Sequence, residues 1–127
     1  MKNQVHFLGH LSRELVRQEM LNADCFVLSS LVETFGVVLI EALACGLPVV
    51  ATRCGGPQDM VHPGNGLLVE PDDASSLSLA LEQIVARADE YRPEQLREDC
   101  LRRFGPAAFV ARATALFENA IGRTAAR

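Results

Sequence analysis

Several features that would place this 127-residue chain in a common class of protein are missing from it. It has no basic cluster: 12 Lys and Arg stand against 16 Asp and Glu, a formal net charge of -4. That balance argues against a nucleic-acid surface or a patch for anionic membranes. No apolar run approaches membrane-spanning length, and residues 1–4 do not resemble the start of a signal peptide. We therefore expect a cytoplasmic domain, with a peripheral membrane location open for a longer parent protein.

Metal-ligand and disulfide spacings are missing as well. The four cysteines are Cys25, Cys45, Cys54 and Cys100. They lack the C-x-x-C spacing of zinc sites, and most of their sequence neighbours are apolar. Reduced thiols fit this pattern better than a disulfide framework. His6 and His62 have no partners at metal-ligand spacing. We predict no metal site and no cofactor.

What the chain does have is enough apolar material for one core. Hydrophobic residues make up 49% and charged residues 22%, which is ordinary for a folded domain. Short apolar runs alternate with helical spacing. The runs predict strands at residues 5–8, 25–29, 47–51 and 67–69. Apolar residues at helical spacing, together with N-cap, glycine and proline signals, predict a first helix that begins after Ser12. Further helices are predicted at residues 37–45, 59–61, 73–91 and 93–104, and a last one after Pro106.

Strands that alternate with helices predict a parallel sheet, so the expected fold class is α/β with about four parallel strands, flanking helices and two C-terminal helices. The strands are almost continuously apolar, as expected when helices cover both faces of a sheet. The last helix carries an apolar stripe made of Phe109, Val110, Ala113, Phe117, Ala120 and Ile121. The simplest interpretation is that the stripe faces the core, and the alternative is an exposed, adhesive surface.

The loop at residues 29–36, with the helix after it, carries the clearest chemistry. Ligands of open parallel sheets gather at the carboxyl ends of the strands, where this loop lies. A helix N-terminus offers unpaired N–H groups to a phosphate, and Gly36 lets a ligand approach the backbone. Glu33 precedes the helix and Glu41 lies two turns inside it. Because a carboxylate can accept hydrogen bonds from two neighbouring hydroxyls, the pair suits a nucleotide sugar.

These motifs resemble those of a known family. The Glu33-(x7)-Glu41 pattern within residues 29–51 closely resembles the donor-site signature of the GT-B retaining glycosyltransferases of family 4. Three further segments resemble that family in the same order: residues 5–9, 54–61 and 64–73. The resemblance covers roughly residues 5 to 90, and the ordered set is far more specific than any one motif.

The resemblance implies a role for each residue. Glu33 would lie near the donor sugar as the catalytic candidate, and Glu41 would hydrogen-bond the ribose hydroxyls. Backbone contacts to the donor would come from Thr34, Phe35, Gly36 and Val37. Secondary candidates for contacts to the donor sugar or its loops are His10, Gly55 and Gly56. Asp59 stands where the family more often has glutamate. The implied reaction transfers a sugar from a nucleotide diphosphate with retention of configuration and without a metal.

The resemblance also implies that much of such an enzyme is not in this sequence. The family has an N-terminal acceptor domain and a C-terminal donor domain with strand order 3-2-1-4-5-6. Residues 1–127 would be a partial donor domain beginning at strand 3. The missing strands carry the Arg and Lys that neutralise the diphosphate, and neither Arg53 nor the pair Arg13 and Arg17 is an evident substitute. We expect the chain on its own to be inactive and to associate through exposed edges with a missing domain or a second copy.

The missing strands leave three outcomes open for residues 5–8. The segment could pair beside residues 25–29, a second copy could fill the gap, or the segment could be poorly ordered. Two other functions are weighed. A non-catalytic binding or assembly module derived from the domain is the alternative. A dehydrogenase is set aside because no G-x-G-x-x-G follows a predicted strand, and a related GT-B epimerase stays an analogy of fold alone.

Overall fold

The computed structural model describes residues 4–125, and the side chains of those up to residue 121. Three parallel strands form one sheet in the order β1-β2-β3: β1 (Phe26–Leu28), β2 (Val49–Thr52) and β3 (Gly66–Val69). The register pairs Val27 with Val50 and Val50 with Leu67. All four residues of β2 are buried, as the apolar runs predicted for strands covered on both faces.

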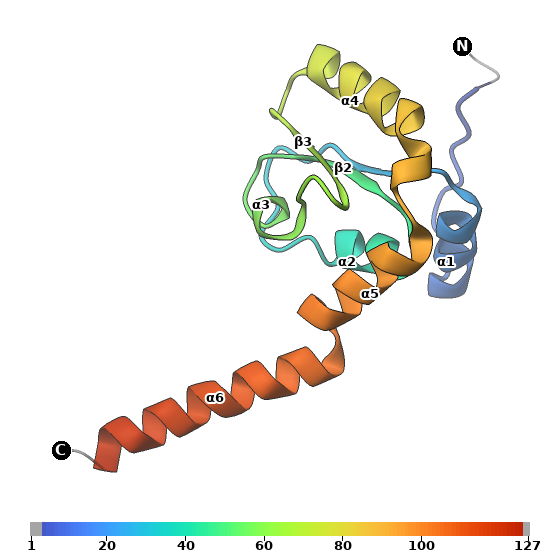
Figure 1. The fold of residues 1–127 in the computed structure, drawn as a ribbon. Helices are drawn as coiled ribbons and strands as arrows, with labels where there is room; N and C mark the ends of the chain where they lie inside the picture. The colour runs from blue at the N-terminus through green and yellow to red at the C-terminus, as the bar shows by residue number, and fades with distance from the viewer. Residues whose placement is uncertain (1–3, 126–127) are drawn as a thin grey trace.

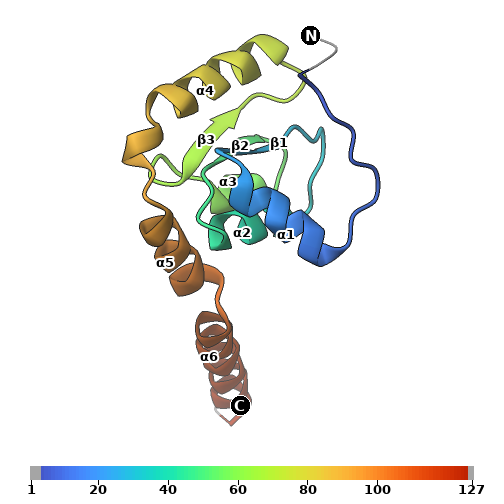
Figure 2. The same ribbon diagram turned by 90° about the vertical axis from the view of Figure 1, so that its right-hand side faces the viewer.

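Helices follow the strands and cover both faces of the sheet (Figures 1 and 2). In chain order they are α1 (Arg13–Asn22), α2 (Val37–Ala44), α3 (Pro57–Met60), α4 (Ala74–Ala86), the 3-10 turn η1 (Ala88–Glu90), α5 (Pro93–Phe104) and α6 (Pro106–Ala125). Figure 2 shows α4 on one face, over β3, and α2 with α1 beside it on the other. No helix within residues 4–125 combines the length and hydrophobicity needed to cross a bilayer.

The core lies between β2 and the helices on either side. Its largest fully buried side chains include Leu39 and Leu43 of α2, Met60 of α3 and Ile84 of α4. Burying side chains of this size contributes about 1.5–3 kcal/mol each. The core therefore holds α2, and with it the loop at residues 29–36, in a fixed place against the sheet.

The first predicted strand does not form. Residues 5–8 have no regular secondary structure, and the side chain of Phe7 is 96% exposed. The sheet therefore has three strands among the described residues, and the prediction of a fourth was wrong. An isolated run of apolar residues becomes a strand only by exchanging hydrogen bonds with a neighbour. Residues 5–8 pair with neither β1 nor β3, so the first of the three outcomes left open, pairing beside residues 25–29, does not occur.

The last helix forms where predicted, but its apolar stripe is not buried. In Figures 1 and 2, α6 extends away from the body of the molecule. Phe109, Val110, Phe117 and Ile121 are each 60–69% exposed. The spacing predicted the stripe correctly, and of its two interpretations the structure contradicts the simpler one, a stripe facing the core, and shows the exposed one. Helical spacing determines which side chains share a face, whereas the connection at Gly105 decides where that face points.

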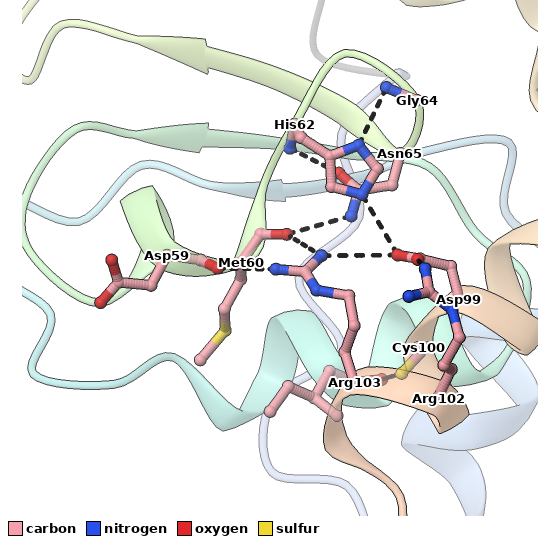
Figure 3. A network of polar contacts seen from close by, with 10 residues as sticks. Asp59, Met60, His62, Gly64, Asn65, Asp99, Cys100, Arg102 and Arg103 are labelled. Carbon is pink, nitrogen blue, oxygen red and sulfur yellow. Dashed lines mark hydrogen bonds and ion pairs between the residues drawn. The ribbon is translucent and has the colours of Figure 1, made fainter. Parts of the chain in front are cut away.

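A polar network holds α5 against the turn that precedes β3 (Figure 3). His62 Nε2 lies 3.1 Å from Asp99 Oδ2, and Arg103 donates to the backbone oxygens of Met60 and Asp59 at 2.9 and 2.7 Å. Arg97, also on α5, donates to the carbonyl oxygens of Ala44 and Cys45 and so satisfies the C-terminal end of α2. Through these contacts α5 fixes both the end of α2 and the turn before β3.

Candidate functional site

The loop after β1 and the loop after β2 are joined at the carboxyl edge of the sheet. The Glu33 N–H donates to the Cys54 oxygen at 3.1 Å, and the Gly56 N–H donates to the Glu33 oxygen at 2.9 Å. The Thr52 hydroxyl donates to the oxygen of Ser30 at 2.5 Å, closer to the strands. The two loops extend the parallel pairing of β1 and β2 beyond the ends of the strands. The backbone around Glu33 is thus held rigidly.

Glycines 55 and 56 allow this close approach. A Cβ on Gly55 would lie 2.6 Å from the Glu33 oxygen, and one on Gly56 would lie 2.5 Å from the Cα of Phe35. Both distances are shorter than real side chains permit. Gly55 also has φ +117, a conformation that favours glycine. The two glycines therefore support the loop that carries Glu33, and Gly56 itself is buried under it.

The side chain of Glu33 is turned back over its own loop. Its Oε1 accepts a hydrogen bond from the Phe35 N–H at 3.3 Å, and the residue is half-buried. Thr34 and Phe35 are exposed beside it. Gly36 follows with φ +89 and leads directly into α2. This arrangement leaves Glu33 at the surface where the two loops meet.

The N-terminus of α2 has no side-chain cap. Gly36 is the N-cap residue and has no side chain to offer, so the first N–H groups of α2 have no side-chain partner. Val37, the first residue of the helix, is 57% exposed. Free N–H groups at the positive end of a helix dipole favour an anionic ligand.

Glu41 lies in an open hollow between α1 and α2, which we call the α1–α2 hollow. Its volume is about 650 Å³, and its lining includes Leu11, Arg13 and Arg17 from the α1 side and Val37, Val38 and Glu41 from α2. Glu41 is exposed, and its side-chain carboxylate has no hydrogen bond or ion pair within residues 4–125. A free carboxylate in a hollow of this size can receive the hydroxyls of a ligand.

The structure does not bring all the predicted residues into one hollow. Val37 and Glu41 line the α1–α2 hollow, whereas Glu33, Thr34 and Gly36 do not. Phe35 lines a different hollow of about 800 Å³, at the base of α6 beside Phe104 and Phe109. His10 is exposed and lies outside both. Glu33 therefore lies on the joined loops, outside the hollow in which Glu41 lies.

Sequence reasoning missed the contribution of α1 to the α1–α2 hollow. Arg13 and Arg17 are one helical turn apart, so the sequence placed them on one face of a helix. It gave no sign that these arginines share a hollow with Glu41, because the position of α1 beside α2 is decided by the tertiary structure. Nowhere in the described part of the chain do three His, Cys, Asp or Glu side chains come together as metal ligands.

Comparison with known proteins assigns the family. The model of the glycosyl transferases group 1 matches residues 1–100. The chain belongs to this family. Sucrose-phosphate synthase of Zea mays is 46% identical over 90 residues, which are 70% of this chain and 8% of that protein. Sucrose-phosphate synthase 4 of Arabidopsis thaliana is 56% identical over 62 residues, 48% of this chain and 6% of that protein.

Solved structures of glycosyltransferases share the fold. A sucrose-phosphate synthase from Thermosynechococcus elongatus superposes with a TM-score of 0.81 at 34% identity, over 95% of this chain and 31% of that one. Anabaena Alr3699/HepE in complex with UDP gives a TM-score of 0.80 at 27% identity, over 93% of this chain and 33% of that one. The fold is that of the Rossmann-like C-terminal domain of GT-B glycosyltransferases. This chain spans about a third of the length of these two structures.

Proposed function

We propose that this chain carries part of the donor site of a retaining glycosyltransferase, which transfers a sugar from a nucleotide-diphosphate sugar to an acceptor. One observation carries the proposal: Glu41, a carboxylate without a partner, lines a hollow that also contains the uncapped start of α2. A diol acceptor next to an anion-favouring helix end matches a ribose joined to phosphates. Anabaena HepE, which shares the fold, was solved with UDP and with UDP-glucose.

In this proposal five of the predicted residues keep their roles. Glu41 binds the ribose hydroxyls in the α1–α2 hollow, and Val37 lies at the phosphates. Glu33, held by the joined loops, faces the donor sugar as the catalytic candidate, with Thr34 and Gly36 offering backbone contacts. Because Glu41 lines the α1–α2 hollow and Glu33 does not, the two carboxylates are assigned to different parts of the donor.

The chain alone is proposed to lack activity. It covers 31% of the sucrose-phosphate synthase structure that it resembles, so most of such an enzyme lies outside it. An acceptor domain and the remaining donor-domain strands would have to come from elsewhere. The alternative function is a non-catalytic binding or assembly module, in which the donor surface contacts a protein instead of a nucleotide.

Thermal unfolding with nucleotides tests the proposal. The chain is melted with UDP, GDP, ADP and their sugar conjugates, alongside Glu41→Ala. The matched control is Glu82→Ala, which removes an exposed glutamate from α4, far in sequence from the hollow. A ligand that binds only the folded state adds about 2.7 kcal/mol of stability at one hundred times its dissociation constant.

A melt raised by one nucleotide in the wild type and in Glu82→Ala, but not in Glu41→Ala, supports the donor site and identifies the base. A cooperative melt that no nucleotide changes contradicts the donor site and favours the binding-module alternative.

A further inference from the structure

The α1–α2 hollow contains charges of opposite sign that do not pair with each other. Arg13 and Glu41 both line it, yet neither has an ion pair among the described residues. Arg17 pairs with Glu14 at 3.6 Å, with side chains 60% and 66% exposed. An exposed pair of that kind contributes little stability, so Arg17 can exchange its partner at little cost. The unpaired charges leave space for a ligand between them.

The lining of the hollow holds more arginines than carboxylates, although Glu14, outside the lining, offsets the charge of Arg17. Two arginines face one glutamate there, and the lining includes the first residues of both helices, Arg13 of α1 and Val37 of α2. A positive side chain at a helix N-terminus is unfavourable toward the helix dipole, so Arg13 does not stabilise α1 by its charge. Arg13, which has no ion pair among the described residues, and Arg17, once it releases Glu14, supply the positive charge that favours an anion here.

We propose that Arg13 and Arg17 bind the phosphate groups of the nucleotide whose ribose Glu41 holds. The inference rests on the proposed function and adds two binding residues to it. Arginines one turn apart on a helix present two guanidinium groups on one side, and a guanidinium donates two parallel hydrogen bonds to phosphate oxygens. These two residues then supply positive charge that a diphosphate requires and that the sequence alone did not locate.

The experiment compares nucleosides with their diphosphates. Affinities of uridine and UDP, guanosine and GDP, and adenosine and ADP are measured by calorimetric titration for the wild type, Arg13→Gln, Arg17→Gln and the double variant. Arg92→Gln is the matched control, because Arg92 is exposed at the start of α5 and its side chain caps no N–H group. Thermal melts without ligand verify that each variant is folded.

We expect the double variant to weaken the binding of the preferred diphosphate by about tenfold or more, the loss typical of charge-assisted hydrogen bonds. Nucleoside affinity should stay the same, and Arg92→Gln should bind like the wild type. In the wild type, the ratio of diphosphate affinity to nucleoside affinity should also fall when salt is added, and in the double variant this ratio should fall less.

Two results overturn the inference, and they differ from each other. If the wild type binds a diphosphate and the double variant keeps the same advantage of diphosphate over nucleoside, Arg13 and Arg17 do not bind phosphate, and the donor site stands without them. If the wild type binds no nucleoside and no diphosphate, the proposed function fails, and the role of the arginines fails with it.

Discussion

Gly56 shows how one residue supports the geometry of the loop that carries Glu33. It is buried beneath Phe35, and an added Cβ would lie 2.5 Å from the Cα of that residue. Its own φ of -46 is open to any amino acid. The need for glycine here therefore comes from the neighbouring loop alone, and no rule about turns would identify it.

Replacing Gly56 with alanine should force the two loops apart. We expect Gly56→Ala to lower the free energy of unfolding by about 1–3 kcal/mol, the usual cost of overpacking, and to weaken nucleotide binding by displacing Glu33 and Gly36. Urea denaturation and nucleotide titration measure the two effects. Gly64→Ala is the matched control, because its Cβ would meet only the His62 ring, at 3.2 Å. Equal stability of the two variants would contradict the close packing of the loops.

At the scale of elements, Asp99 connects α5 to the turn before β3. Burial alone raises the pKa of its carboxyl, but the hydrogen bonds from His62 and Arg103 outweigh burial and hold the pKa below its usual range. A carboxyl whose pKa is lower in the folded state stabilises the fold while it is ionised. That stability is present above the unfolded-state pKa of about 4 and is lost as the pH falls through the lower folded-state pKa.

Asp99→Asn should remove this acid-dependent stability. At pH 7 we expect the variant to be less stable by about 1 kcal/mol, the value of a charge-assisted hydrogen bond reduced by partial exposure. Below pH 4 the wild type should approach the variant. Urea denaturation at a series of pH values measures the difference, with Asp89→Asn, an exposed residue of η1, as the control. A difference that does not shrink in acid would mean that the network stabilises by packing alone.

At the scale of the whole molecule, the body and α6 should respond differently to the loss of apolar side chains. Leu43 is 1% exposed in the core, whereas Phe117 on α6 is 69% exposed. We expect Leu43→Ala to cost about 2–5 kcal/mol and Phe117→Ser to change stability by about 0.5 kcal/mol or less. Chemical denaturation of both variants tests this contrast.

The exposed stripe of α6 should also affect association. Contiguous apolar surface that nothing covers favours contact with another molecule. We expect Phe117→Ser to reduce concentration-dependent association, measured by sedimentation velocity, and Leu43→Ala to leave the association of the folded fraction unchanged. An unchanged sedimentation coefficient at every concentration in both wild type and variant would contradict the predicted self-association.

Most local elements, and the family, could be predicted from residue types and their spacing alone. The helices α2 and α5 begin where glycine, proline and apolar spacing placed them, and the strands β1 to β3 coincide with three of the four apolar runs. Near their ends the predictions were less reliable: the helix expected at residues 73–91 ends at Ala86 and continues as η1. Such features depend on neighbours in the chain, whose effect on backbone conformation can be read from their residue types.

What those elements face depends on tertiary packing. Residues 5–8 are as apolar as a strand but pair with none of the three described strands, and Phe109, Val110, Phe117 and Ile121 on α6 stay exposed. Packing also created neighbours that no sequence pattern indicated. It placed Arg13 and Arg17 in the same hollow as Glu41 and brought Gly56 beneath Phe35. Burial and the approach of distant side chains are properties of two surfaces together, and a sequence pattern describes only one of them.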